Sequence, residues 1–197
     1  MQRSRHLHRK IYSMIRVLDF IFSFFGLLIL SPVLIVLVVV GLFDTGSPLF
    51  LQKRVGRHRR TFTLIKFRTM SKSTPSQASH LVSSAQITKY GSFLRRTKLD
   101  ELPQLLNVVT GAMSLVGPRP CLPNQDELIL LRKESGVFHF RPGITGLAQI
   151  NNIDMSEPEI LVKKEVEMVN DFTVTAYFKY IFATVGGKGS GDAIKSI

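Results

Sequence analysis

A long stretch without charge, from Phe20 to Phe43, constrains this chain more than any other feature of its sequence. It reads FIFSFFGLLILSPVLIVLVVVGLF, and about 20 apolar residues are enough to cross the hydrocarbon core of a bilayer as a helix. The stretch is too long for the apolar part of a secretory signal, and no small-residue cleavage site follows it. The sequence therefore predicts that residues 1–47 form a basic N-terminal segment and a membrane-inserted helix.

Two paths through the membrane remain open for this helix. Pro32 removes a backbone donor and favours a kink, and the hydroxyl of Ser31 can satisfy a carbonyl that the kink frees. Lysine and arginine crowd both flanks of the stretch, and such flanks prefer the cytoplasmic side. A re-entrant hairpin would keep both flanks there, whereas a kinked spanning helix would separate them. Arg16 and Asp19 are three residues apart and are expected to pair on one helical face.

A turn cluster at residues 44–48 follows the apolar stretch and marks a domain boundary. Short apolar alternations on either side of a basic, Gly56-containing turn predict a β-hairpin between Leu49 and Met70. Lys66 and Arg68 would share one face of the second strand, because side chains alternate along a strand. Two cations on one face form either a phosphate clamp or an ordinary charged surface, and the hairpin alone does not decide between them.

Beyond the boundary, residues 48–185 are assigned to one small domain. Within it, the Ser-rich stretch 71–84 is expected to be a mobile loop, and the Gly-rich tail 186–197 is expected to be disordered. Cys121 is the only cysteine, which excludes an internal disulfide and a thiolate metal site. Three helices are expected in the C-terminal half: 124–135 and 157–169, both amphipathic with solvated acids, and the apolar 174–185, either a core or an interfacial helix.

Two adjacent carboxylates, Asp100 and Glu101, follow a long stretch in which Asp19 and Asp44 are the only acids. The net charge of +12 indicates an anionic partner: nucleic acid, anionic lipid or a phosphorylated substrate. Residues 87–104 predict a helix followed by a turn, so the carboxylates lie near a helix start, where acids commonly serve as caps. A carboxylate among arginines also stays ionised and can bind a metal ion or attack phosphorus.

Rigid turns present two further arginines to a possible phosphate. Arg119 lies in the sequence Gly-Pro-Arg-Pro, and Arg141 begins the sequence RPGITGLAQI. A guanidinium on a stiff backbone suits bidentate recognition of phosphate, although plain structural turns remain the alternative. Arg95 precedes the two carboxylates by about a turn and a half. His139, between two phenylalanines, is expected to pack rather than to catalyse.

Together these blocks resemble one family, the bacterial sugar transferases of the monotopic polyprenyl-phosphate phosphoglycosyl transferase type. The resemblance runs from about Arg16 to Asp154, and several blocks in the same order make it specific. The blocks are the Ser-Pro break at residues 31–32, KFRTM at 66–70, LDELPQLLNV at 99–108, MSLVGPRP at 113–120 and RPGITGLAQI at 141–150.

The resemblance implies a fold, a location and an activity. The fold is α+β and mostly helical, with a re-entrant membrane helix hairpin, a short β-hairpin and amphipathic interfacial helices. The implied location is the bacterial inner membrane, with a monotopic anchor and the catalytic domain on the cytoplasmic face. The implied reaction moves a sugar 1-phosphate from a UDP-sugar to undecaprenyl phosphate or a similar polyprenyl phosphate and releases UMP. Membrane lipids are expected partners, and nucleic acid is not.

The resemblance also assigns roles to individual residues. Asp100 matches the nucleophile that forms a covalent phosphosugar intermediate, with magnesium close to it, and Glu101 matches the second member of the dyad. Cations that would bind the substrate phosphates are Lys66, Arg68, Arg95, Arg119 and Arg141.

Two departures from the family pattern stand out, because Ala112 replaces a usual acid and Leu147 stands where tryptophan is frequent. The alternatives are a membrane-anchored module that binds anionic lipid or nucleic acid without catalysis, and a relative that has lost activity. The first accounts for the charge but not for the ordered blocks, and Ala112 is the hint for the second.

Overall fold

The computed structural model describes residues 2–74 and 86–189 and has a mostly helical α+β fold, as the sequence predicts. The expected loop 71–84 falls largely outside the described residues, as does most of the expected tail. The elements are α1 (Gln2–Thr45), β1 (Leu49–Val55), η1 (Arg57–Arg59), β2 (Thr61–Phe67), α2 (Lys89–Thr97), η4 (Leu99–Glu101), α3 (Gln104–Val109), β3 (Ser114–Val116), α4 (Asp126–Glu134), η5 (Val137–His139), β4 (Gly143–Thr145), α5 (Leu147–Ile150), α6 (Pro158–Asn170) and α7 (Val174–Val185).

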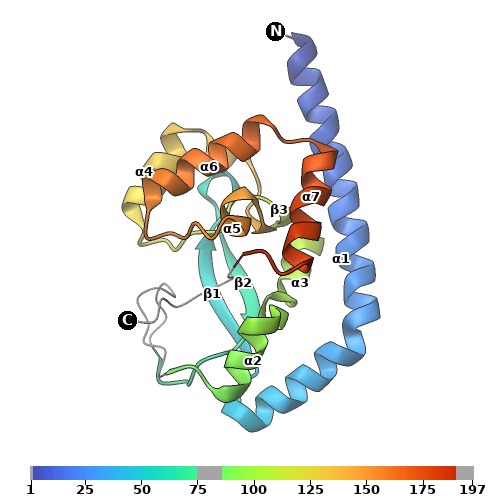
Figure 1. Cartoon of the computed structure of the whole chain (residues 1–197), viewed down its shortest axis with the longest axis vertical. Coiled ribbons are helices and arrows are strands. Elements are labelled where there is room, and N and C mark those ends of the chain that lie inside the picture. Colours follow the sequence, from blue (N-terminus) through green and yellow to red (C-terminus); the bar gives the residue numbers. More distant parts are fainter. Residues whose placement is uncertain (1, 75–85, 190–197) are drawn as a thin grey trace.

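The long helix α1 runs along one side of the molecule and turns beneath it at its C-terminal end (Figure 1). The bend has the local chemistry that the sequence predicts. Pro32 lies inside the helix and has no N–H to donate to the carbonyl of Leu28, four residues earlier. The hydroxyl of Ser31 donates to that carbonyl instead, at 2.8 Å. The helix therefore continues through the proline as one bent element.

Both halves of α1 are attached to the same globular domain. In the N-terminal half, the buried carboxylate of Asp19 accepts hydrogen bonds from the hydroxyls of Ser114 and Tyr177, each at 3.0 Å. In the C-terminal half, Leu37 is buried in a cluster with β2 and α2, and its carbonyl accepts from the hydroxyl of Tyr90 at 2.7 Å. The domain thus lies alongside the helix over most of its length.

Arg16 and Asp19 do not form the direct ion pair that their spacing allows, although the charge of Arg16 still lowers the pKa of Asp19 against the larger effect of burial. The guanidinium of Arg16 donates to the carbonyls of Val108 and Val109, at 2.6 and 3.0 Å, and so caps the C-terminal end of α3. Two hydroxyls and one backbone amide donate to Oδ1 of Asp19 instead. The local spacing of the two residues is helical, but the tertiary contacts determine their partners.

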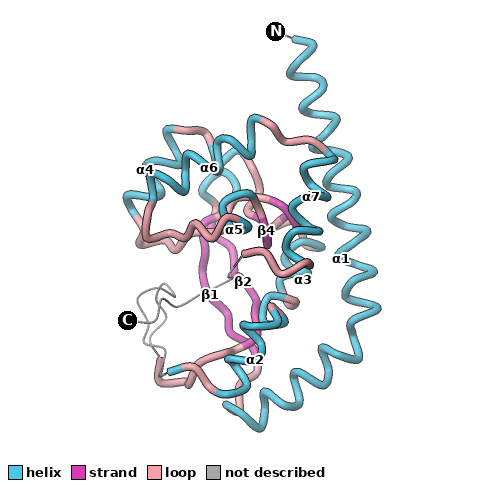
Figure 2. Tube along the Cα trace, in the orientation of Figure 1, coloured by secondary structure: helices cyan, strands magenta, loops and turns pink. Residues whose placement is uncertain are grey.

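The predicted β-hairpin is confirmed. Strands β1 and β2 pair antiparallel, with Leu49 opposite Phe67 and Val55 opposite Thr61, and they occupy the middle of the molecule (Figure 2). The turn between them is η1, the basic stretch that contains Arg57. On the far side of the hairpin from α1, helices α4 and α6 pack together over a core that includes Leu128 and Leu161.

A second, parallel sheet was not predicted. Strand β3 pairs with β4, and the pairing places the Gly-Pro-Arg-Pro turn beside the Arg-Pro-Gly turn. The two backbones come so close that side chains do not fit between them. A Cβ on Gly117 would lie 2.3 Å from the carbonyl oxygen of Arg141, and one on Gly143 would lie 2.0 Å from the amide of Gly117. Glycine at both positions is therefore a requirement of this contact.

Three helices form in the C-terminal half as predicted, with one correction to their side chains. α4, α6 and α7 fall at the expected places, but the expectation that the acids of the first two are solvated is wrong for Glu165, which is 1% exposed. One side of α7 packs in the core, where Tyr177 is buried, and another side lies at the surface, where Phe182 is 68% exposed. Residues 186–189 close the end of α7, and the rest of the tail lies outside the described residues.

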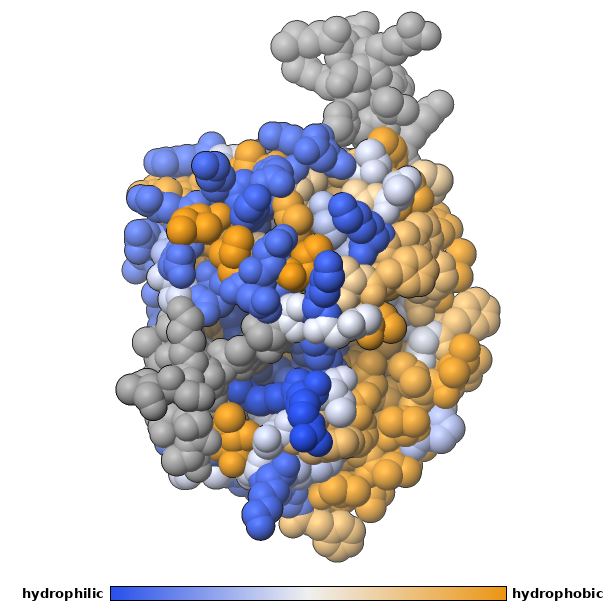
Figure 3. All heavy atoms as spheres, in the orientation of Figure 1, coloured by the Kyte–Doolittle hydropathy of each residue, from blue (hydrophilic) through white to orange (hydrophobic). Residues whose placement is uncertain are grey.

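The outer side of α1 carries the apolar surface of the molecule. Within the described residues, α1 is the one helix whose length and composition suit a membrane span. Figure 3 shows apolar atoms covering the α1 side, while hydrophilic atoms cover the side of α4 and α6. Large side chains such as Phe43, at 89% exposure, and Ile29, at 73%, face outward from the helix. Because a soluble surface rarely exposes so large a contiguous patch, this side suits an apolar environment.

Candidate active site

The two carboxylates lie in the short turn η4, between the end of α2 and the start of α3. Asp100 is 3% exposed and Glu101 is 8% exposed, so both are shielded from bulk water. η4 packs against α2 and β2, and β2 carries the buried Lys66. The chain reaches this turn through Lys98, which adopts a left-handed conformation with φ of 58° and ends α2. A helix, a sharp reversal and a second helix thus hold the carboxylates in place.

A buried amide fixes the helix that follows the dyad. The side-chain carbonyl of Asn107 in α3 accepts from the amide of Ile65, and its NH₂ group donates to the carbonyl of Thr63, at 3.0 and 2.8 Å. The side chain therefore pairs with β2 much as another strand would. Sequence reasoning did not single out Asn107, because nothing local distinguishes it from a polar residue on a helix surface.

Lys98 joins the dyad turn to the C-terminal end of α7. Its ammonium donates to the carbonyl of Lys188 at 2.5 Å, and the carbonyl of Thr184 lies at 3.4 Å. Burial lowers the pKa of Lys98, and the charge of nearby Glu101 opposes that shift. α7 and the dyad turn are therefore coupled through one side chain.

Arg119 pairs directly with the dyad. One guanidinium nitrogen of Arg119 lies 3.0 Å from Oε1 of Glu101, in a partly buried ion pair. Arg119, Lys66 and Gln104 line one small hollow beside β2. The structure thus brings the predicted phosphate-binding cations Arg119 and Lys66 together beside the second acid of the dyad, and this arrangement suits binding and transfer of a phosphoryl group.

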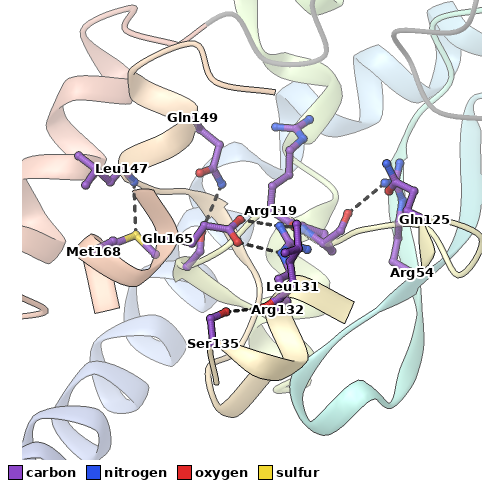
Figure 4. Close-up of polar contacts among 12 residues, drawn as sticks. Arg54, Arg119, Gln125, Leu131, Arg132, Ser135, Leu147, Gln149, Glu165 and Met168 are labelled. Carbon is purple, nitrogen blue, oxygen red and sulfur yellow. Dashed lines mark hydrogen bonds and ion pairs between the residues drawn. The ribbon is translucent and has the colours of Figure 1, made fainter. Parts of the chain in front are cut away.

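The turn that carries Arg119 is held from both sides by buried arginines (Figure 4). Arg54 donates to the carbonyl of Pro120 at 3.0 Å, and Arg132 donates to the carbonyl of Arg119 itself at 2.9 Å. Arg132 in turn forms a buried ion pair with Glu165, with Nε to Oε2 at 2.8 Å. These supporting contacts were not predicted from the sequence, because the acids of both helices were expected to lie in solvent and nothing singled out Arg132.

Two further predicted cations make contacts around the hairpin and the end of α1. Nε of Arg95 donates to the hydroxyl of Thr69 at 2.9 Å, which ties α2 to the segment after β2. Nε of Arg68 donates to the carbonyl of Ser47 at 3.0 Å, near the end of α1. Lys66 and Arg68 do share a strand face, because both cationic groups lie over the ring of Phe50, at 5.7 and 5.4 Å from its centre.

Arg141 lines a different and larger cavity of about 320 Å³. This cavity lies between α1 and the two proline-containing turns, which are Gly-Pro-Arg-Pro at residues 117–120 and Arg-Pro-Gly at residues 141–143. Nε of Arg141 donates to the carbonyl of Gly111 at 2.9 Å. Arg16 and Arg57 line the same cavity, together with His139. His139 is exposed and makes an edge-to-face contact with the ring of His58, with the ring centres 5.8 Å apart.

The acidic groups at the dyad suit a magnesium ion that is completed by substrate. No cluster of three or more potential metal ligands occurs among the residues that the structure describes. Mg²⁺ nevertheless commonly uses one or two carboxylates, with phosphate oxygens and waters as its remaining ligands. Asp100 and Glu101 supply two hard oxygen ligands at one turn, so the donor set fits an ion that arrives with a phosphorylated substrate.

Comparison with known proteins gives consistent matches over nearly the whole chain. The uncharacterized sugar transferase EpsL of Bacillus subtilis is 38% identical over 172 residues, which cover 86% of this chain and 84% of EpsL. The exopolysaccharide production protein ExoY of Sinorhizobium fredii is 34% identical over 189 residues, with 86% and 83% covered.

Longer proteins match as well. The UDP-glucose:undecaprenyl-phosphate glucose-1-phosphate transferase of Escherichia coli K12 is 36% identical over 182 residues, which cover 86% of this chain but only 39% of that protein. The chain therefore corresponds to less than half of that longer relative. The family model described as bacterial sugar transferase matches residues 11–188. By this match, and by relatives such as EpsL that are more than 30% identical over most of both chains, the chain belongs to the bacterial sugar transferase family.

Proposed function

We propose that this chain is a phosphoglycosyl transferase that moves a sugar 1-phosphate from a UDP-sugar to a polyprenyl phosphate at a membrane surface. The observation that carries the proposal is the shielded Asp100–Glu101 turn, with Arg119 paired to Glu101 and Lys66 beside it. Two relatives, 36% and 37% identical to this chain, are named for transfer of glucose 1-phosphate to undecaprenyl phosphate. The ExoY relatives, which are named for exopolysaccharide production, support a role in polysaccharide synthesis.

The chemistry divides into two displacements at one phosphorus. In the first, a carboxylate oxygen of Asp100 attacks the β-phosphorus of the UDP-sugar. An aspartyl–phosphorus bond forms while the bond to the bridging diphosphate oxygen breaks, and UMP leaves with that oxygen. In the second, a phosphate oxygen of the polyprenyl phosphate attacks the same phosphorus, and the aspartyl–phosphorus bond breaks. The sugar phosphate is then part of a polyprenyl diphosphate, and the carboxylate is regenerated.

The cations around the dyad suit this reaction. Charge builds on the non-bridging oxygens of the phosphorus in each displacement, and Arg119 and Lys66 are placed to neutralise it. Shielding from water favours transfer over hydrolysis of the covalent intermediate. Asp100, with Glu101 beside it, would hold a magnesium ion, which supplies further neutralisation of phosphate charge when bound.

The attachment of α1 favours the re-entrant path. Asp19 and Asp44 are separated by about 38 Å of helix at 1.5 Å per residue, which exceeds the roughly 30 Å hydrocarbon core. Yet the domain contacts the helix at both places, since Asp44 accepts from the hydroxyl of Thr88 at 2.8 Å. A perpendicular span would draw the polar domain into the bilayer. A shallow, bent insertion leaves the domain at the cytoplasmic face, where UDP-sugars are made.

Release of UMP tests the activity. The purified full chain is incubated with undecaprenyl phosphate, Mg²⁺ and each of a panel of UDP-sugars. At least one donor should give UMP, and Asp100→Asn should abolish its release. Asp126→Asn, which changes an exposed acid at the start of α4, should leave the rate within about twofold. Equal rates for Asp100→Asn and the unsubstituted chain would remove Asp100 as nucleophile, and absence of turnover with every donor would favour the non-catalytic alternative.

Membrane topology is tested separately with single cysteines. Ser13 and Ser73 are both exposed and lie on opposite sides of the apolar stretch in the sequence, while the native Cys121 is buried. In sealed inside-out vesicles, an impermeant maleimide should label both Ser13→Cys and Ser73→Cys. Labelling of only one of them from that side would show that α1 spans the membrane.

A further inference from the structure

The 320 Å³ cavity between α1 and the two proline-containing turns is separate from the chemistry proposed above. Neither Asp100 nor Glu101 lines it. Its walls come from the first part of α1, from η1, from the ends of β3 and η5, and from the last turn of α6 with the loop after it. The lining divides into an apolar part, with Ile15, Val116, Met168 and Phe172, and a cationic part.

The cationic part has an excess of positive charge and free donors. Arg16, Arg57 and Arg141 line it against the single carboxylate of Asp19, whose Oδ1 accepts from three donors. Arg57 and Arg141 are each anchored through Nε, at 2.8 and 2.9 Å, to backbone carbonyls. Within the described part of the chain, their terminal nitrogens make no hydrogen bond, so two guanidinium groups remain available for an anion.

Further features of the cavity indicate a ligand with an acceptor group. Burial, and next the charges of Arg57 and Arg16, lower the pKa of Arg141, and the charge of Asp19 opposes that shift, so Arg141 experiences repulsion from its two cationic neighbours. An anion between them would relieve that repulsion. The hydroxyl of Tyr12, also in the lining, is buried and has no hydrogen-bond partner among the described residues.

The position of the cavity identifies the class of ligand. The part of α1 that lines it runs from Tyr12 to Asp19, and on the same turns Met14 and Val17 are 46% and 55% exposed, at the beginning of the apolar surface. The cavity therefore lies where α1 passes from basic to apolar, which is the level of lipid headgroups for a membrane-inserted helix. Arginines beside an apolar floor match a phosphate group that carries a hydrocarbon portion.

We infer that this cavity binds the headgroup of an anionic phospholipid, with its phosphate on Arg57 and Arg141 and the first part of its hydrocarbon chains against the apolar floor. The lipid is a structural ligand and is not consumed, because the dyad lies outside the cavity. The inference rests on the membrane placement proposed above. It adds a second phosphate site to the protein, which would hold the first part of α1 at the membrane surface during turnover.

Binding of defined lipids to the detergent-purified full chain tests the inference, with native mass spectrometry to measure apparent Kd. Phosphatidylglycerol is the anionic probe and phosphatidylcholine the zwitterionic one. The double variant Arg57→Gln/Arg141→Gln should weaken phosphatidylglycerol binding at least tenfold and phosphatidylcholine binding by less than twofold. Arg57→Gln alone, at an exposed residue whose loss leaves the core intact, should weaken phosphatidylglycerol at least threefold. Arg60→Gln, an exposed arginine of the same turn outside the lining, should change it less than twofold.

Two further arms separate this site from the dyad. Asp100→Asn should bind phosphatidylglycerol like the unsubstituted chain, even if it loses UMP release. Equal phosphatidylglycerol affinity in the double variant, or an equal loss in Arg60→Gln, would overturn the inference. So would a double variant that loses affinity for undecaprenyl phosphate or UMP while keeping phosphatidylglycerol, since the cavity would then belong to a substrate.

Discussion

The buried pair Arg132–Glu165 gives a prediction in which stability and activity separate. Both residues are 1% exposed, and two nitrogens of Arg132 contact the carboxylate of Glu165. Removing one member of such a pair leaves an uncompensated buried charge, at a cost of about 3–5 kcal/mol. For a chain of this length each kcal/mol corresponds to roughly 2–4 °C, so Arg132→Met should lower the melting temperature by about 6–20 °C.

Replacing both members should return most of that stability. In Arg132→Met/Glu165→Leu neither charge of this pair remains, and apolar replacement of both members of a buried pair is often neutral or stabilising. The carbonyl of Arg119 still loses its donor, because Arg132 supplies that hydrogen bond at 2.9 Å. We therefore expect the double variant to melt near the unsubstituted chain but to release UMP about ten- to a hundredfold more slowly, as small displacements of a catalytic group commonly cause.

Circular dichroism melts and UMP kinetics on the same detergent-purified samples measure both quantities. Lys164→Gln is a suitable control, because the Lys164–Glu167 pair is exposed and should contribute little. A single variant that melts like the unsubstituted chain would refute the argument about buried charge. A stable double variant with full kcat would show that Arg132 supports the fold without positioning Arg119.

Three further predictions follow from individual contacts. Gly117→Ala should disrupt the β3–β4 contact and lower the melting temperature clearly, because the added Cβ would lie 2.3 Å from the carbonyl oxygen of Arg141. Gly26→Ala is the control and should be tolerated, because its Cβ would lie at an ordinary 3.5 Å from the side chain of Leu105. Asn107→Ala leaves a backbone amide and a carbonyl of β2 without their partner and should cost about 1–3 kcal/mol in denaturant unfolding. Burial raises the pKa of the Cys121 thiol, so less thiolate forms at neutral pH, and maleimide should modify the native protein far more slowly than the unfolded one.

Local patterns predicted the parts of the fold that local chemistry determines. The carbonyl freed by Pro32 and the hydroxyl that satisfies it are within four residues of each other, so the bend in α1 could be predicted from the sequence. The β1–β2 hairpin likewise follows from alternation and a short basic turn. The adjacency of Asp100 and Glu101 was visible directly, although their common shielding from water was not.

The missed features all depend on partners far away in the chain. Glu165 lies on a helix that looks amphipathic, and only the packing of α6 against α4 turns it toward Arg132. The parallel β3–β4 pair uses strands of three residues each, too short to show a period. Asp19 looked like a helical partner for Arg16, whereas its real partners are 95 or more residues away.

The two proline-containing turns explain why the separate sequence blocks must occur together. The parallel pairing of β3 with β4 fixes the Arg119 turn against the Arg141 turn, so that one arginine faces Glu101 and the other faces the cavity beside α1. Arg54 from β1 and Arg132 from α4 hold the first turn by its carbonyls, and Arg16 from α1 caps the helix that follows the dyad. Helix α1, the hairpin and the dyad region are thus joined through backbone contacts of arginines. Because α3 directly follows the dyad in the chain, we expect loss of the Arg16 contact to disturb the dyad turn and to slow UMP release.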